Sequence, residues 1–206
     1  LSEALMATVT PSRVLADAYT GSVERARSML ERYGPFIERS GSVEALPGLA
    51  TARATLALVE GDYEDVFDQA ARMEGATLAC PTDFYSVVGH AALAGKDERW
   101  MSHAVEKLTK HAARSNLVTA RRHTAEAGLM ALAGDRARAI ELYRAVIEEW
   151  RELQIPLDLA LCQMDFAVAI GSPDGDRDAE EATSFFKRAG NDFLVARLDS
   201  WNSAPA

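Results

Sequence analysis

The stretch from Ala131 to Trp150 reads ALAGDRARAIELYRAVIEEW, and it decides the fold. An apolar helical segment ends at Gly134, Asp135 follows, and a second segment begins. Glycine accepts the left-handed backbone that commonly ends a helix, and an aspartate after it can accept hydrogen bonds from the free amides of the next helix. In the second segment apolar residues recur at steps of three and four, which is typical of an amphipathic helix. The stretch therefore predicts a helical hairpin.

Four other stretches have the same order of apolar helix, glycine, polar turn and second helix. Their glycines are Gly21, Gly61, Gly95 and Gly171, and with Gly134 the spacings run from 34 to 40 residues. Internal periods of this size are typical of helical repeat proteins. No segment alternates at a period of two for long enough to predict a sheet. The pattern predicts helices near residues 2–19, 22–33, 48–60, 63–74, 81–94, 97–114, 117–133, 136–153, 157–170, 177–189 and 192–200.

The composition agrees with an all-α chain and excludes several classes of function. Of 206 residues 48% are hydrophobic, aromatic residues make up only 7%, and alanine, the best helix former, is abundant. The net charge of −9 argues against a nucleic-acid partner, because an acidic surface repels phosphate. No apolar run approaches the roughly 20 residues that cross a bilayer, and no signal peptide is visible, so we expect no membrane partner.

The hairpins resemble the tetratricopeptide repeat, in which a small residue follows the turn glycine by five positions and an aromatic residue by nine. Ala139 and Tyr143 fit this pattern in the fourth unit. The corresponding pairs in the other units are Ala26 and Leu30, Val66 and Ala70, Trp100 and Ala104, and, after an insertion of residues 172–177, Ala182 and Phe186. Seven residues before each glycine lie Val14, Ala54, Val88, Ala127 and Met164. The family's tryptophan is absent and its closing proline is not in its usual place. The resemblance implies an all-α fold, a right-handed superhelix of about five hairpins that forms one domain over residues 1–206.

A narrower resemblance covers the last hundred residues. It rests on residues 108–114, 131–150, 157–167, 180–182 and 193–199, which are similar to the C-terminal helical region of bacterial STAND-type ATPase regulators. Those proteins join the ATPase to an adenylate or guanylate cyclase domain or to a LuxR-type DNA-binding domain. The resemblance implies a bacterial, non-catalytic module for signal transduction or transcriptional regulation, whose parent protein carries the enzymatic activity. The chain begins with leucine, and we expect it to be a fragment of that larger protein.

In stacked helical hairpins the first helices line a concave face, where peptides or partner domains dock. The tetratricopeptide positions that usually face inwards select Tyr85, Gly89, Arg121, Thr124, Gly128, Asp158 and Asp165. Tyr85 and Arg121 lead this set, because tyrosine and arginine are common interface anchors. The alternative is that neighbouring helices occupy these positions, and that Gly89 and Gly128 only permit close helix packing. We expect the partner to be a protein, a peptide or a neighbouring domain of the same chain.

No pattern of catalytic or metal-binding residues is evident, so we expect no catalytic residue, no metal and no cofactor. The four histidines lack the spacing of a helical zinc site, and neither cysteine lies in a C-x-x-C motif. Residues 89–96 depart from the phosphate-binding loop, and residues 174–178 start like a calcium loop but lack its glycine and closing glutamate. Two other functions stay open: an all-α enzyme with Asp158, Asp165 and His123 around a cleft, and a homodimerisation scaffold.

The two cysteines, Cys80 and Cys162, lie far apart in sequence beside apolar residues. A disulfide between them stays open as an alternative. We favour two buried thiols in a reducing compartment, which predicts a cytoplasmic protein.

Overall fold

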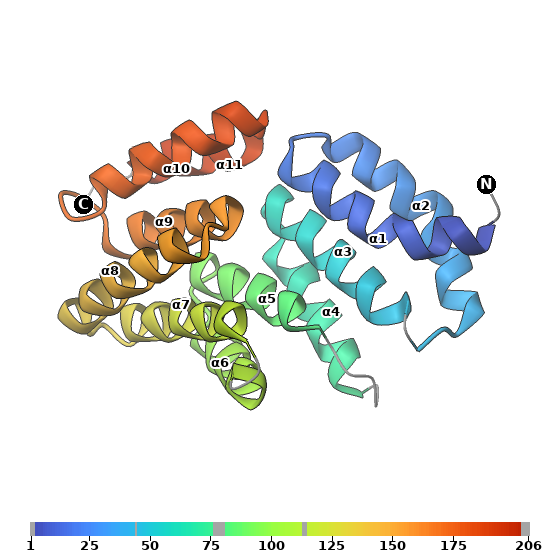
Figure 1. Cartoon of the computed structure of the whole chain (residues 1–206), viewed down its shortest axis with the longest axis horizontal. Helices are drawn as coiled ribbons and strands as arrows, with labels where there is room; N and C mark the ends of the chain where they lie inside the picture. Colours follow the sequence, from blue (N-terminus) through green and yellow to red (C-terminus); the bar gives the residue numbers. More distant parts are fainter. Residues whose placement is uncertain (1–2, 44, 76–80, 113–114, 203–206) are drawn as a thin grey trace.

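The computed structural model describes residues 3–43, 45–75, 81–112 and 115–202, and over these residues the chain is all-α. All the helices expected from the sequence are present (Figure 1). In chain order they are α1 (Glu3–Tyr19), α2 (Val23–Ser40), α3 (Ala45–Glu60), α4 (Tyr63–Gly75), α5 (Thr82–Ala94), α6 (Glu98–Ala112), α7 (Asn116–Leu132), α8 (Arg136–Leu153), α9 (Pro156–Ile170), α10 (Asp176–Ala189) and α11 (Asp192–Asn202).

The helices pack neighbour to neighbour and form a helical array. Each helix contacts the one that follows it, and the odd-numbered helices from α1 to α9 also contact one another in series. The odd helices therefore form an inner layer, and the even helices lie outside it (Figure 1). The inner helices must be buried along much of their surface, and α3 and α5 have long runs of buried small and apolar residues.

The positions that define the repeat in the sequence are all buried. Ala139 and Tyr143 are fully buried between α8 and its neighbours. The same holds for the equivalent residues, which are no more than 9% exposed: Val14, Ala26, Leu30, Ala54, Val66, Ala70, Val88, Trp100, Ala104, Ala127, Met164, Ala182 and Phe186. The periodic apolar residues thus form the seams between helices, as the pattern predicts.

The turn glycines have a positive φ angle, as predicted, in four of the five units. Gly21, Gly61, Gly134 and Gly171 have φ angles between 72° and 83°. The prediction was wrong at Gly95, whose φ is −82°; Lys96 takes the left-handed conformation instead, with φ of 55°. In this unit the glycine keeps a right-handed helical backbone, and the amide of Lys96, instead of that of the glycine, donates to a carbonyl three residues back. A Cβ atom at Gly95 would lie 3.2 Å from the carbonyl oxygen of Ala91, a tight contact, and at an ordinary 3.5 Å from the ring of Tyr63.

The largest difference from the predicted boundaries is in α2, which continues beyond residue 33 through Pro35 to Ser40. Proline removes one helical hydrogen bond, to the carbonyl of Glu31. Both residues lie on the exposed side of the helix, so water can replace that bond. Ile37 is fully buried and continues the apolar stripe, and Gly41 ends the helix in the left-handed conformation.

The two ends of the array meet, which the sequence did not predict. The side-chain amide of Asn191, in the turn before α11, donates to the carbonyl oxygens of Ala18 and Tyr19 at 3.0 and 3.2 Å. Arg197 of α11 donates to the carbonyl oxygen of Leu58 at 2.9 Å, which ties α11 to α3. In Figure 1 the red helices α10 and α11 accordingly approach the blue helices α1 and α2. We call this contact between the α1–α2 turn and the α10–α11 turn the closure contact.

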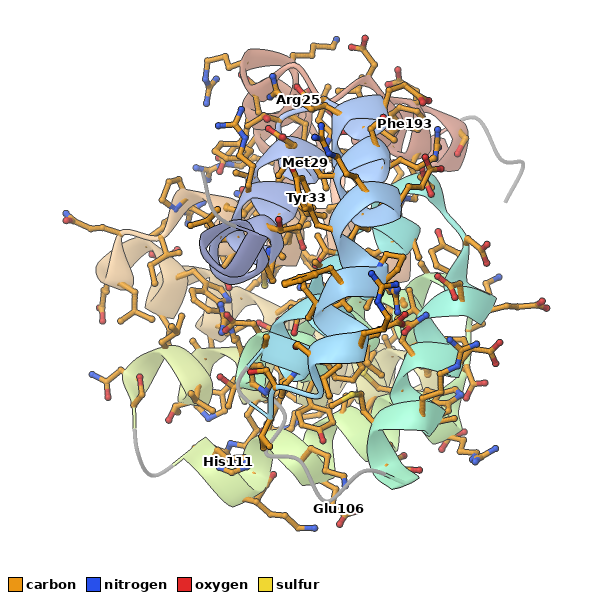
Figure 2. The ribbon with its side chains drawn as sticks, turned by 90° about the vertical axis from the view of Figure 1, so that its right-hand side faces the viewer. Arg25, Met29, Tyr33, Glu106, His111 and Phe193 are labelled. Atoms are coloured by element: carbon orange, nitrogen blue, oxygen red, sulfur yellow. The ribbon has the colours of Figure 1, made fainter. Side chains whose placement is uncertain are left out.

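The outer side of α2 forms one end of the molecule. Arg25, Met29 and Tyr33 follow one another along α2, with Phe193 of α11 nearby in the same view (Figure 2).

Among the described residues, no helix is both long enough and apolar enough to cross a lipid bilayer. Cys162 is buried with a free thiol, whereas Cys80 lies outside the described residues.

Candidate functional site

The inner helices enclose a cavity of about 360 Å³, within the range of small-molecule sites. Most of its lining comes from α1, α3, α5, α7 and α9, and α10 closes one side. The lining residues are Leu15, Ala16, Tyr19, Thr20, Thr51, Thr55, Asp83, Ser86, Val87, His90, Arg121, Leu157, Asp158, Leu161, Phe185 and Ala189. Apolar walls with a few polar groups from different helices are typical of a ligand site.

Part of the cavity lining is a guanidinium group that lies between two carboxylates. Arg121 of α7 donates from Nε to Asp158 Oδ1 of α9 at 3.1 Å and from Nη1 to Asp83 Oδ1 of α5. The side chains of Arg121 and Asp158 are 12% and 15% exposed, whereas Asp83 is half exposed. Burial lowers the pKa of Arg121, but the two carboxylates outweigh it and raise the pKa, so the residue stays charged. The three side chains link three inner helices.

A second polar group joins α5 to α9 below the lining. His90 Nδ1 lies 2.7 Å from Asp165 Oδ2, and both side chains are more than nine-tenths buried. On the other side of the ring, Nε2 lies 3.4 Å from Ser86 Oγ. Burial lowers the pKa of His90, but the attraction of Asp165, with a smaller contribution from Asp158, outweighs it, and the pKa is raised. The histidine is therefore held in one orientation, with one nitrogen on a carboxylate and the other towards a hydroxyl.

One buried polar atom in the lining has no hydrogen-bond partner. Thr55 is fully buried, and its Oγ1 makes no hydrogen bond within the described part of the chain. Tyr19 lies close enough for Thr55 to influence its ionisation, although the two groups do not meet the geometry of a hydrogen bond. Shielding from water raises the pKa of Tyr19 first, and the negative charge of Asp158 raises it further. An unpaired buried hydroxyl is unfavourable, and water or a ligand reaches this one only if the side chains around it move.

Three of the residues predicted for the concave face lie in or next to this cavity. Arg121 and Asp158 line it and are paired with each other. Asp165 lies behind the lining and holds His90. The three side chains, one from α7 and two from α9, therefore lie on the cavity side of these helices.

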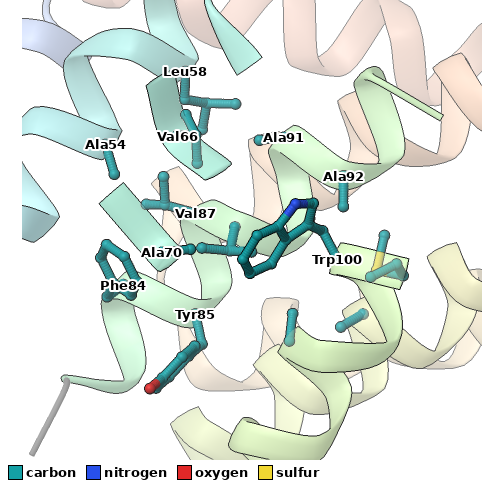
Figure 3. Packing of buried hydrophobic residues seen from close by; sticks show 14 of the residues in the cluster. Ala54, Leu58, Val66, Ala70, Phe84, Tyr85, Val87, Ala91, Ala92 and Trp100 are labelled. Carbon is teal, nitrogen blue, oxygen red and sulfur yellow. The ribbon is translucent and has the colours of Figure 1, made fainter. Parts of the chain in front are cut away.

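Tyr85 and Gly89 lie on α5 outside the cavity lining. Tyr85 is 8% exposed and packs edge-on against Phe84 in a core cluster (Figure 3). The ammonium group of Lys107 lies 5.8 Å from the centre of the Tyr85 ring. A Cβ atom at Gly89 would be 3.8 Å from the side chains of Ala104 and Ala125, an ordinary packing distance. Both residues thus contribute to contacts between helices.

Thr124 and Gly128, the other two predicted residues, belong to the contact between α7 and α8. The Thr124 hydroxyl accepts a hydrogen bond from Trp150 Nε1 at 3.0 Å and donates to the carbonyl oxygen of Ala120 at 3.0 Å. A Cβ atom at Gly128 would be 2.7 Å from the terminal methyl of Met101. That methyl ends a flexible side chain of α6, and the hydroxyl oxygen of Tyr143 on α8 would lie 3.3 Å away, so Gly128 lies where α7 packs against both α6 and α8.

Asp83, Ser86, His90 and Thr55 are among the polar cavity residues that the sequence did not predict. His90 follows Ser86 by four residues, a spacing that places both on one side of a helix. That spacing was available in the sequence, but the partner Asp165 is 75 residues away and comes close only through the packing of α5 on α9. His123, grouped with Asp158 and Asp165 in the enzyme alternative, instead faces α8, where its Nδ1 lies 2.8 Å from Glu149 Oε2.

Among the described residues, no group of three or more histidine, cysteine, aspartate or glutamate side chains is arranged to hold a metal ion. Asp174, part of the calcium-like sequence, is paired with Arg136 at 2.9 Å and Arg144 at 3.3 Å. Comparison with known proteins adds no family: the chain matches no family model, no curated protein and no solved structure. We therefore infer function from the cavity.

Proposed function

We propose that the chain is a non-catalytic binding module, a right-handed tetratricopeptide-like solenoid that takes a ligand on its inner face and passes the binding event to a larger signalling or regulatory protein. The observation that carries the proposal is the cavity, because its apolar walls enclose buried polar groups from separate helices. The groups come from α3, α5, α7 and α9, so a ligand that contacts them bridges much of the array. Ligand binding that favours one arrangement of these helices would shift the conformation of the parent protein.

The cavity refines the partner expected from the sequence. A concave face open along its length would accept an extended peptide, whereas the closure contact brings the α1–α2 turn against the turn after α10. The volume of the cavity suits a small molecule or a single side chain of a partner protein. Neighbouring domains of the same protein would then respond to the arrangement of the helices and would not contact the ligand itself.

The test is a ligand-detected NMR screen of aliphatic and aromatic fragments against the chain and two variants. Ala16 lines the cavity and is exposed, so Ala16→Phe places a ring over the opening without displacing the core. Ala137→Phe adds the same ring to an exposed position of α8 that does not line the cavity and serves as the control. We expect fragments that bind the wild type and A137F and fail to bind A16F. Absence of cavity binders, or equal binding to A16F, would contradict the proposal.

A hydrolase is the second candidate, favoured by the series Ser86, His90 and Asp165. A serine, a histidine and a carboxylate in this order resemble the groups of nucleophilic catalysis. However, Ser86 lies in the middle of α5, where backbone amides are engaged in the helix and do not form an oxyanion hole. A fluorophosphonate probe that labels the wild type but not Ser86→Ala would establish this candidate, and absence of labelling would remove it.

A homodimerisation scaffold, the remaining alternative, predicts a different result. The molar mass of the chain, measured by light scattering, would rise from monomer to dimer with concentration. The wild type and A16F would show the same rise. We favour the binding module because the structure has a cavity lined by charged groups from three inner helices, a feature that dimerisation does not require.

A further inference from the structure

The charges around the cavity do not balance. Asp83 and Asp158 share the single guanidinium of Arg121, which leaves one negative charge in excess. Arg121 bonds only to the Oδ1 atom of each carboxylate. The Oδ2 atoms therefore keep lone pairs that can accept a hydrogen bond from a ligand.

The second polar group does not supply the missing positive charge. His90 is paired with Asp165, so a protonated ring is already neutralised by that carboxylate. Asp158 raises the pKa of both Tyr19 and His90, and this effect is larger than the opposing effect of Arg121 at each residue; Arg197 also opposes it at Tyr19. In a partly buried site an electrostatic effect of this kind is screened less than at the surface.

The remaining polar group in the wall is neutral, and the rest of the wall is apolar. Thr55 Oγ1 makes no hydrogen bond within the described residues, but Thr55 is fully buried, so the polar contacts of a ligand fall to Asp83 and Asp158. Leu15, Leu157 and Leu161 contribute aliphatic surface, and Phe185 contributes a ring. An organic cation with an apolar body meets all of these features at once.

We propose that the cavity binds a small hydrophobic ammonium compound, whose charged group lies against Asp83 and Asp158 and whose apolar body lies among α1, α9 and α10. This inference rests on the proposed function and names the chemical class of its ligand. A carboxylate or phosphate ligand is the obvious alternative, since Arg121 lines the cavity. Arg121 is already paired on two nitrogens with acidic side chains, so an anion would meet a net negative charge.

The experiment compares three probes of equal length and different charge: 4-phenylbutylamine, 4-phenylbutanol and 4-phenylbutyrate. Dissociation constants are measured by NMR titration at low salt. We expect the amine to bind about tenfold or more tightly than the alcohol, as charge-assisted hydrogen bonds are stronger than neutral ones. We expect the carboxylate to bind most weakly, and A16F to weaken binding of the amine.

Two cavity variants and one matched control test whether the preference for the amine over the alcohol depends on the cavity carboxylates. Asp158→Asn and Asp83→Asn remove one carboxylate charge each with little change of shape, and Asp83 is exposed enough for its variant to fold if D158N does not. Asp174→Asn removes a carboxylate that pairs with two arginines outside the cavity. The preference for the amine over the alcohol should fall severalfold in D158N and D83N and persist in D174N.

The outcomes separate this inference from the proposed function. Equal binding of amine and alcohol, tighter binding of the carboxylate, or an unchanged preference in both cavity variants would overturn the ligand class while leaving a small-molecule site in place. Failure of all three probes to bind at saturating concentrations would overturn the proposed function and this inference together.

Discussion

Arg121 and Thr124 lie three residues apart on α7, yet they occupy different environments. Arg121 lines the cavity and pairs with carboxylates from α5 and α9. Thr124 is buried in the contact between α7 and α8, where it accepts a hydrogen bond from Trp150. Both were predicted for the concave face from the same repeat register. The comparison shows that one inward side of a helix can serve binding at one turn and stability at the next.

The contact between α7 and α8 has the character of a core. Trp150 and Tyr143 are almost completely buried there, and the Tyr143 ring packs 5.3 Å from that of Phe166. The cavity wall instead contains paired charges and empty volume. Substitutions in the α7–α8 contact should therefore affect the free energy of unfolding most, and substitutions in the cavity wall should affect binding more than stability.

The largest expected effect is at Trp150. Trp150→Ala removes a large buried side chain and leaves the Thr124 hydroxyl without its donor, so the free energy of unfolding should fall by about 4 kcal/mol. Urea denaturation followed by circular dichroism measures this. The exposed Arg138→Ala in the same helix is the control, with an expected change below about 0.5 kcal/mol. A loss below about 1 kcal/mol in W150A would contradict the role of this contact.

The closure contact gives the next largest effect, through a comparison of two glycines. Gly21 and Gly61 both have left-handed backbones, so alanine at either position costs about 1–2 kcal/mol in backbone strain. A Cβ atom at Gly21 would also overlap the carbonyl oxygen of Gly190, whereas Gly61 has open space around it. We expect Gly21→Ala to lower the free energy of unfolding by about 3 kcal/mol or more. Equal losses in G21A and Gly61→Ala, measured by urea denaturation, would show that the array does not close.

The buried pair of His90 and Asp165 predicts a pH dependence of stability. The folded pKa of His90 is raised above the unfolded value of 6.5, so the pair stabilises the fold fully below pH 6.5. That stabilisation is lost as the pH rises through the folded pKa. The difference in unfolding free energy between the wild type and His90→Gln should therefore shrink from pH 6 upwards. Since His103, whose pKa is lowered, is present in both proteins, its contribution cancels. A difference that stays constant or grows with pH would contradict the pairing.

The smallest expected effect is at the mouth of the cavity. The Asp83 side chain is 52% exposed, and exposed ion pairs contribute little to stability. Asp83→Asn should change the free energy of unfolding by about 0.5 kcal/mol or less, although we expect it to weaken binding of an ammonium ligand. Chemical denaturation and NMR titration of the same samples separate the two effects. A large loss of stability would mean that Arg121 and its partners are a structural network instead of a binding site.

The helices and their seams were predictable because they depend on local patterns. The periodic residues of α8, such as Ile147 and Trp150, appear in the sequence at helical spacing and are buried in the structure. Glycine positions predicted the turns except at Gly95, where the left-handed residue is Lys96. The left-handed residue is shifted by one position, but the sequence pattern is little changed. Asp97 still caps the next helix, where its side chain accepts a hydrogen bond from the amide of Trp100.

The cavity could be predicted only in part. The repeat register brought Arg121 and Asp158 together, since equivalent positions on successive inner helices face the same side. The pairing of His90 with Asp165 and the bonds of Asn191 to α1 join residues 75 and 173 positions apart. Both contacts depend on how tightly the whole array curves. The pattern of apolar residues within a single helix does not predict that curvature.

The most direct test of the account is whether the first and last turns of the array meet in solution. A nitroxide is attached at Asp192→Cys, an exposed position beside Asn191, in a chain with Cys80 replaced by serine. Cys162 stays unlabelled, since burial raises its pKa and shields the thiol. The account predicts strong paramagnetic broadening of the amide signals of residues 20–22, which lie about 170 residues away in sequence. Full intensity of these signals in the oxidised sample would show an open array and contradict it.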